Sequence, residues 1–243
     1  MKKTAPSFTF IVPALNEEKN LPAVVGEIAG HAELSGVRDY EVIIIDDGSA
    51  DATAAVAEGL CARHGNISLL RNAQRKGVGK SFLMGVNAAR KDYCLIVPGD
   101  NEFDLDFFPE AVDRLAADGS HFIITYLENP HVRPLHRRVL STLYIRLFNI
   151  LFSTGFKYTN GIVIYPTEWI RSVKLDSGGY TFQSEALLKV HREGKRFVQI
   201  AMKTRPRRHG KSKIFSIRVL AEVVVSLIRM KREKRTPVTA SDI

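Results

Sequence analysis

Cysteine is scarce in this chain. Its 243 residues include only two, Cys61 and Cys94, and their spacing matches neither a disulfide framework nor a cysteine metal site. Both lie in apolar stretches, so we expect two buried free thiols in a reducing compartment. The sequence thereby excludes the small disulfide-rich scaffolds of secreted proteins.

Long apolar runs are also missing. No stretch approaches the roughly 20 apolar residues that are needed to cross a bilayer. The longest one near the end, residues 219–228, is interrupted by Glu222 and Ser226. The segment that follows Met1 does not resemble a secretory signal. We therefore expect a cytoplasmic protein, and peripheral attachment to the inner face of the cell membrane stays open.

Positive charge exceeds negative charge. The chain has 35 Lys and Arg against 26 Asp and Glu, a net charge of +9 and a pI near 9.6. This balance favours anionic partners such as nucleotide diphosphates, lipid phosphates or an acidic membrane surface. Nucleic acid is not expected, because aromatic residues are not interleaved with the basic ones. No repeat or linker divides the chain, which is long enough for one large α/β domain.

Three predicted strands end in carboxylates. The central one, residues 41–45, is an apolar run that is typical of a strand buried on both faces. Ligands of open α/β sheets bind just past the carboxyl ends of the strands. The alternative is that such acids only cap the helices that follow, but three acid-ended strands in one chain favour a ligand site. In chain order, these ends carry Glu17, then Asp46 and Asp47, then Asp100 and Glu102.

Two of these ends predict particular contacts. Glu17 would accept a hydrogen bond from a ribose or a base; otherwise it is a favourable charge in the first turn of a helix that Asn16 caps and that ends near residue 32. Asp100 and Glu102 stand two residues apart in a turn, so both could meet one hard cation. The alternative is an acidic turn that binds nothing.

A cationic loop follows the predicted strand at 67–70. Residues 71–81 resemble a phosphate-binding loop, but its first glycine is missing where Ala73 or Gln74 stands, so ATP hydrolysis is not expected. A loop with Lys76 and Gly77 can still bind phosphate through backbone N–H groups and the helix N-terminus. A solvated basic turn is the alternative.

The second half carries further positive charge. An amphipathic helix from residue 129 to 151 has a cationic face, which either faces solvent or contacts a membrane or lipid phosphate. A final helix at 214–230, followed by basic residues, is either a packing helix or an interfacial anchor. The dense basic run at 203–213 predicts a clamp for a diphosphate.

The remaining elements follow from apolar periodicity and turn residues. Helices are predicted at 52–64, 81–90, 107–117 and 178–193, and strands at 8–12, 93–97, 121–125, 161–165 and 197–202.

Short motifs follow one another along the chain. The first half carries Val12-Pro13-Ala14-Leu15-Asn16-Glu17, Asp46-Asp47-Gly48-Ser49, Lys76-Gly77-Val78-Gly79 and Gly99-Asp100; the second carries Tyr158-Thr159-Asn160-Gly161, Gly179-Tyr180-Thr181-Phe182-Gln183-Ser184-Glu185 and Arg207-Arg208-His209-Gly210-Lys211-Ser212-Lys213. Taken in order, these motifs resemble family-2 glycosyltransferases of the GT-A fold, over roughly residues 8–215. The second half resembles the branch of dolichyl-phosphate mannose synthases and undecaprenyl-phosphate glycosyltransferases.

The resemblance implies a Rossmann-like α/β fold with a mixed, mainly parallel sheet flanked by helices. It implies one glycosyltransferase domain at 1–215, followed by an amphipathic helix and a basic, partly disordered tail at 216–243. It also implies a GDP- or UDP-linked sugar donor and a divalent cation, Mg²⁺ or Mn²⁺, on Asp100 and Glu102. The implied donor-binding residues are Pro13, Leu15, Glu17, Ile45 and Asp47 around base and ribose, and Lys76, Gly77, Arg207 and Lys213 on phosphate.

Several positions depart from the family pattern. Pro98 replaces the first aspartate of the Asp-x-Asp motif, and Glu102 stands where this branch often has a metal-binding glutamine. Leu15 replaces a tyrosine, Lys157 replaces an aspartate, and an arginine expected after the fifth strand is absent. These changes leave the donor and the acceptor open.

The expected reaction inverts the anomeric carbon by in-line attack. The metal on Asp100 and Glu102, with Arg207 and Lys213, would neutralise the leaving nucleoside diphosphate. A polyprenyl phosphate acceptor is already anionic and requires no general base, whereas a glycan hydroxyl requires one. The candidate bases are Glu185, Asp104 and Asp106. A soluble or polymeric hydroxyl acceptor, a non-catalytic nucleotide-sugar binder and a homodimer all stay open.

Overall fold

The computed structural model describes residues 6–117, 121–179, 181–206 and 217–233. Seven strands of this part form one sheet in the order β3-β2-β1-β4-β6-β5-β7. β6 is antiparallel to both of its neighbours, and every other pair is parallel, which confirms the mixed, mainly parallel sheet. The strands are β1 Phe8–Ala14, β2 Tyr40–Asp46, β3 Ile67–Arg71, β4 Tyr93–Ile96, β5 Phe122–Leu127, β6 Val163–Pro166 and β7 Phe197–Met202.

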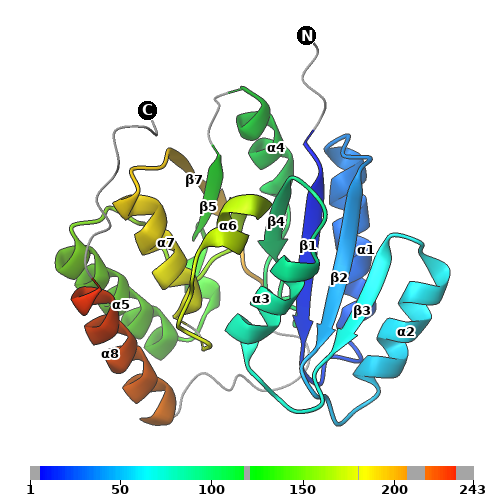
Figure 1. The fold of residues 1–243 in the computed structure, drawn as a ribbon, viewed down its shortest axis with the longest axis horizontal. Helices are drawn as coiled ribbons and strands as arrows, with labels where there is room; N and C mark the ends of the chain where they lie inside the picture. Colours follow the sequence, from blue (N-terminus) through cyan, green and yellow to red (C-terminus); the bar gives the residue numbers. More distant parts are fainter. Residues whose placement is uncertain (1–5, 118–120, 180, 207–216, 234–243) are drawn as a thin grey trace.

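Helices cover both faces of the sheet (Figure 1). α1, α2 and α4 pack on one face, and α3, α5, α6, α7 and α8 pack on the other, each group with its own buried apolar cluster. β1 and β2 supply side chains to both clusters alternately, because neighbouring side chains of a strand point to opposite faces. The helices are α1 Leu21–Leu34, α2 Thr53–Arg63, α3 Val78–Ala88, α4 Phe108–Ala117, α5 Leu135–Phe152, α6 Thr167–Ser172, α7 Phe182–Arg192 and α8 Ile217–Arg232, with a 3₁₀ turn, η1, at Pro130–Val132.

The structure differs from the sequence prediction at several helices, of which α1, α3 and α6 are the clearest. Asn16 does not cap α1: it has φ 59°, its side-chain oxygen accepts a hydrogen bond from Ala50 N at 2.8 Å, and the helix begins only at Leu21. α3 begins before the predicted residue 81, directly after Gly77. α6 was not predicted, because a helix of six residues is too short to show a periodic apolar pattern.

No helix in the described part of the chain is long and apolar enough to cross a membrane. α8 packs on the domain, since Leu227 and Met230 belong to the same buried cluster as α3, α5 and α7. The division near residue 215 stays a prediction, because residues 207–216 lie outside the described ranges.

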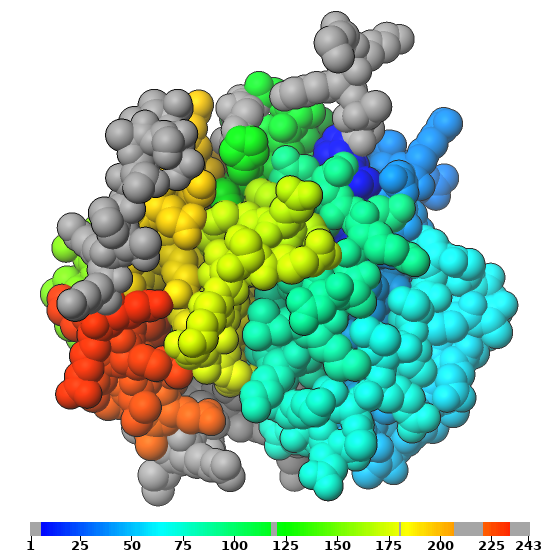
Figure 2. All heavy atoms as spheres, in the orientation of Figure 1, coloured from blue at the N-terminus to red at the C-terminus, as the bar shows by residue number. Residues whose placement is uncertain are grey.

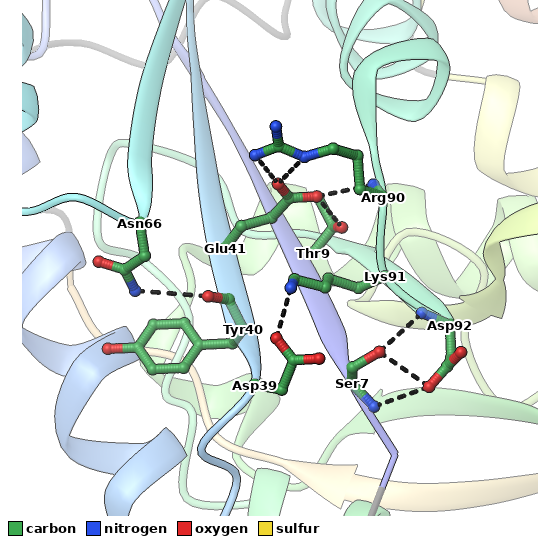
Figure 3. Close-up of polar contacts among 9 residues, drawn as sticks. All are labelled: Ser7, Thr9, Asp39, Tyr40, Glu41, Asn66, Arg90, Lys91 and Asp92. Carbon is green, nitrogen blue, oxygen red and sulfur yellow. Dashed lines mark hydrogen bonds and ion pairs between the residues drawn. The ribbon is translucent and has the colours of Figure 1, made fainter.

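Charged side chains tie the starts of β1, β2 and β4 together, at the end of the sheet opposite the acid-ended tips (Figure 3). Glu41 at the start of β2 is 3% exposed and accepts hydrogen bonds from Thr9 Oγ1 at 2.8 Å and from Arg90 N and Nη2, both at 2.7 Å. Burial alone raises the pKa of Glu41, but the backbone N–H and guanidinium of Arg90 and the Thr9 hydroxyl outweigh it, so the pKa lies below its ordinary value.

Arg90→Ala should destabilise the protein at neutral pH by about 1 kcal/mol, because the buried carboxylate loses its charged donors. A carboxyl whose pKa is depressed by folding contributes stability above its unfolded pKa and loses it as the pH falls through the folded pKa. The difference in free energy of unfolding between wild type and variant should therefore shrink as the pH falls below the pKa of Glu41. Urea unfolding at a series of pH values measures it.

Lys91→Ala is the matched control, because Lys91 pairs with Asp39, whose side chain is 68% exposed. Such surface pairs contribute little, so this variant should unfold like the wild type at every pH. A pH-independent loss in Arg90→Ala would contradict the assignment to Glu41.

Candidate active site

The three acid-ended strands lie side by side, with β1 between β2 and β4. Asp47 N donates to the carbonyl of Ala14 at 2.9 Å, and Gly99 N donates to the carbonyl of Pro13 at 3.0 Å. The loops after β2 and β4 are thus bonded directly to the end of β1. Because all three strands are parallel, their carboxyl ends share one edge of the sheet, which is where ligands of open α/β sheets bind.

Asp47 holds the loop between β3 and α3. Its carboxylate is 4% exposed and accepts hydrogen bonds from Lys76 N at 2.8 Å, Gly77 N at 2.9 Å and Asn72 Nδ2 at 2.9 Å. Because Asp47 already takes these two backbone N–H groups, a phosphate at this loop would be bound by other groups, and the predicted phosphate contacts of Lys76 and Gly77 stay a prediction. The Lys76 side chain is exposed and stays a candidate for phosphate.

Gly48 lets this loop approach. It has φ 75°, and a Cβ at this position would lie 2.9 Å from Arg75 N. A side chain is therefore excluded both by the backbone conformation and by the backbone opposite. The close approach of the two loops keeps Asp47 out of solvent.

Glu17 lies in a loop, not in a helix. Its backbone N donates to Thr53 Oγ1 at 2.8 Å, and its carboxylate accepts from Asn20 Nδ2 at 2.7 Å. Asn16 N likewise donates to Ser49 Oγ at 3.0 Å. The loop after β1 is thereby fastened to the loop after β2, and Glu17 is only 7% exposed.

The turn after β4 carries the predicted metal ligands. The Asp100 carboxylate accepts a hydrogen bond from Glu102 N at 3.2 Å, and the Glu102 carboxylate lies 3.5 Å from Arg137 Nη2. Glu102 is 7% exposed, and the Arg137 side chain is 16% exposed. The ion pair therefore neutralises a buried carboxylate with a largely buried arginine of α5.

The segment that follows β7 fixes this turn from the other side. The carbonyl of Glu102 accepts hydrogen bonds from Arg205 N at 2.7 Å and Thr204 Oγ1 at 2.8 Å, and Asp104 N donates to the carbonyl of Lys203 at 3.1 Å. The acidic turn is thus joined to the chain just before the basic run. Arg207 and Lys213, the predicted diphosphate ligands, lie outside the described residues.

Asp100 and Glu102 fit a divalent cation. Carboxylate oxygens are the ligands that Mg²⁺ and Mn²⁺ prefer, and Asp100 is half-buried at the sheet edge. Arg137 supplies a positive charge beside the buried Glu102 carboxylate. A cation bound to these two carboxylates would supply the same compensation.

A second acidic cluster is better explained as structure. Glu27, His31 and Asp104 place ligand atoms within 4.8 Å of one another. However, Arg205 donates to both oxygens of Glu27, at 2.6 and 2.9 Å, and lies 2.9 Å from Asp104. The hydrogen bonds with Glu27 raise the pKa of Arg205, so its charge is permanent. The guanidinium of Arg205 therefore already neutralises the carboxylates of Glu27 and Asp104, so a metal ion is not needed there.

Arg133 places a second guanidinium near the acidic turn. Its Nη1 donates to Tyr158 Oη at 2.7 Å, and its Cζ lies 5.6 Å from the centroid of the Phe103 ring. The sequence placed Arg133 and Arg137 on a cationic face that contacts solvent, a membrane or lipid phosphate, and did not predict that they lie near the acidic turn. The signal that could have found them is the buried acid Glu102, which requires a nearby cation.

Two other predicted site residues, Glu185 and Ile45, lie in the interior of the protein. Glu185 is 2% exposed and accepts hydrogen bonds from Asp176 N at 2.8 Å and Ser177 N at 2.9 Å, while Arg229 lies 3.3 Å away. This bonding argues against Glu185 as a general base. The side chain of Ile45 is fully buried in the core and does not line the edge. Pro13, in β1, and Leu15, directly after β1, are half-buried at this edge of the sheet.

Arg137→Gln should lower the melting temperature of the metal-free protein, because Glu102 is then a buried charge without its cation. If Asp100 and Glu102 bind a divalent cation, Mn²⁺ should raise the melting temperature of this variant more than that of the wild type. Thermal unfolding with and without Mn²⁺ measures both effects. Arg146→Gln, on the exposed side of α5, is the control. Equal Mn²⁺ shifts in all three proteins would contradict a cation at Glu102.

Comparison with known proteins identifies the family of this chain. Residues 9–177 match the model of glycosyl transferase family 2. An undecaprenyl-phosphate mannosyltransferase of Micrococcus luteus is 28% identical over 90% of this chain and 91% of that protein. A polyprenol monophosphomannose synthase of Mycolicibacterium smegmatis is 30% identical over 84% of this chain and 79% of that protein.

Solved structures agree on the fold. Glucosyl-3-phosphoglycerate synthase of Mycobacterium tuberculosis, crystallised with UDP, has a TM-score of 0.72 at 18% identity and matches 95% of this chain and 82% of that one. The same enzyme with Mn²⁺, UDP-glucose and phosphoglyceric acid has a TM-score of 0.71, over 95% of this chain and 81% of that one. The sheet, the matched residues and the relatives lead to one conclusion: the chain belongs to glycosyl transferase family 2 and is a glycosyltransferase.

Proposed function

We propose that this glycosyltransferase moves a sugar from a UDP- or GDP-linked donor to a polyprenyl phosphate, with inversion at the anomeric carbon. The observation that carries the proposal is the acidic turn at the end of β4. There the Glu102 carboxylate lies 3.5 Å from Arg137 Nη2, and the Asp100 carboxylate accepts a hydrogen bond from Glu102 N in the same turn. In this turn, the two carboxylates can bind a divalent cation, and the nearby guanidinium of Arg137 can bind a phosphate.

The names of the relatives support the acceptor. Both curated relatives reported above are named for sugar transfer to polyprenyl phosphates, and they align with most of this chain. A phosphate oxygen is anionic near neutral pH and can attack without a general base. An acceptor that needs no base agrees with the structure, because two of the three candidate bases are already engaged. Glu185 accepts a hydrogen bond from Ser177 N, and Asp104 pairs with Arg205.

The donor site would use the shared edge of β1, β2 and β4. Glu17 and Asp47 are candidates for ribose and base, and the exposed Lys76 for phosphate, with Pro13 and Leu15 beside them. Arg207 and Lys213 remain the proposed diphosphate ligands. Asp100 and Glu102 would hold Mg²⁺ or Mn²⁺, which supplies positive charge to the leaving diphosphate. The structural neighbour binds Mn²⁺ with UDP-glucose.

In this proposal, the side chains of Arg133 and Arg137 bind the acceptor phosphate. Arg137 lies in the first turn of α5 and Arg133 just before the helix, both near the acidic turn. A guanidinium binds phosphate oxygens through two parallel N–H groups, so these side chains can orient an incoming phosphate toward the sugar. The acceptor would be drawn from the inner face of the cell membrane, where the enzyme would be peripheral.

A hydroxyl acceptor is the second candidate. It requires a base, and of the three predicted bases only Asp106 has an exposed carboxylate, which lies 3.6 Å from His31 Nε2. Burial and the neighbouring Asp104 raise the pKa of Asp106, as a base requires. Asp106→Asn separates the two acceptors, since it should abolish transfer to a hydroxyl and leave transfer to a phosphate intact.

Asp100→Asn should reduce transfer to undecaprenyl phosphate by about a hundredfold or more, because it removes charge that positions a cation on the leaving group. The assay supplies radiolabelled UDP- and GDP-sugars with Mn²⁺ and detergent-dispersed undecaprenyl phosphate. Asp113→Asn, an exposed aspartate of α4, should retain full activity. Wild-type activity in Asp100→Asn, or wild-type transfer only to hydroxyl acceptors, would refute the proposal.

A further inference from the structure

Exposed apolar side chains gather on two helices. Ten large hydrophobic residues are exposed in the described part of the chain, and nine of them lie on α5 and α8; the tenth, Leu34, is on α1. Single exposed hydrophobic residues are normal, but a contiguous group marks an interaction site. The nine are Leu135, Val139, Leu140, Leu143, Leu147, Ile150, Val224, Val225 and Ile228.

These residues form stripes along the outer sides of both helices. Leu135, Val139, Leu143 and Leu147 follow one another at intervals of four, which places them on one side of α5. Ile150 continues the stripe and is 78% exposed. The apolar stripe therefore runs along most of α5.

α5 and α8 lie side by side at one end of the molecule (Figure 1). Lys231 Nζ donates to the carbonyl of Leu151 at 2.8 Å, so the C-terminal ends of the two helices meet. Each helix packs its other side on the same buried cluster, α5 through Phe148 and α8 through Leu227. The exposed stripes are thus both turned away from the core, and Figure 2 shows α8 at the surface of the molecule.

The charge around these stripes is positive. α5 contains no acidic residue, and its basic side chains include the exposed Arg146. The sequence of α8 has one acid, Glu222, and ends in Lys231 and Arg232. Apolar stripes with cationic flanks complement a surface that is apolar inside and anionic outside. Anionic lipid bilayers have this construction.

We infer that the outward sides of α5 and α8 form a docking surface for an anionic bilayer, on which both helices lie in the membrane plane. The inference rests on the proposed function for its purpose, since a polyprenyl acceptor is reached only at a membrane. α5 carries the stripe along its length and, near its start, holds Arg137 on Glu102. Docking of this helix therefore places the acidic turn beside the lipid headgroups, where an acceptor phosphate lies.

Vesicle sedimentation tests the inference. The full chain should bind vesicles of phosphatidylcholine with phosphatidylglycerol, bind less to phosphatidylcholine alone and be released by salt, which screens the cations. The double variant Leu143→Glu, Leu147→Glu should bind the mixed vesicles at least about tenfold more weakly, because two leucines no longer enter the bilayer and two charges oppose it. Leu34→Glu, which changes the exposed leucine of α1, should bind like the wild type.

Two further measurements keep the result unambiguous. Ile150→Glu, at a still more exposed position, should weaken binding in the same direction without disturbing the fold. Equal binding by the wild type and all variants, or no binding by the wild type, would overturn the inference. So would a wild-type dimer that the double variant converts to monomer with vesicle binding unchanged, since a second copy then covers the surface. Melting-temperature shifts by UDP and GDP report donor binding separately, so the proposed function can fail or hold independently of docking.

Discussion

The site depends on two hydrogen bonds at the end of β1. Asp47 N to Ala14 O and Gly99 N to Pro13 O hold the loops after β2 and β4 against the central strand. They exist only because β1 lies between β2 and β4 and runs parallel to both. A shift of one residue in either pairing would turn inward side chains outward and displace the acids. The apolar core and the candidate donor site are therefore specified by the same register.

The buried carboxylates of the candidate site differ in the groups that hold them. Asp47 and Glu185 accept hydrogen bonds from backbone N–H groups, which are fixed parts of the loops that they shape. Glu102 instead faces the side chain of Arg137, a cation of α5. A side chain can move away more readily than a backbone group, so a metal ion could take the place of Arg137 beside Glu102. The turn after β4 is for this reason the part of the edge where we propose the cation.

Much of the fold could be predicted from the sequence, because buried parallel strands are continuous apolar runs that end abruptly in polar residues. The acid-ended strands predicted that their carboxylates lie along one edge of the sheet, as they do. The bonding within that edge could not be predicted. Nothing in the sequence shows that Asp47 takes the N–H groups of Lys76 and Gly77, or that Asn16 adopts a left-handed conformation. Such details depend on contacts between loops that are distant in the chain.

The contact between Arg137 and Glu102 is another that the sequence could not predict. Helical periodicity placed it on a cationic face, whereas tertiary packing buries most of it against Glu102. The prediction left open whether this helix packs on the core with a solvated basic side or contacts a membrane or lipid phosphate. The structure buries Phe148 on one side of the helix and exposes Ile150 on another. Periodicity gives the faces of a helix, but the surface that each one meets is decided by the rest of the fold.

Hydrogen–deuterium exchange of the full chain with UDP or GDP and Mn²⁺ tests the central claim most directly, because it maps the donor site without reference to activity. The account predicts slower exchange of the backbone amides in residues 15–18, 46–49 and 98–103 when the nucleotide and the ion are bound together. Nucleotide-dependent protection elsewhere in the chain, with these three loops unchanged, would contradict it.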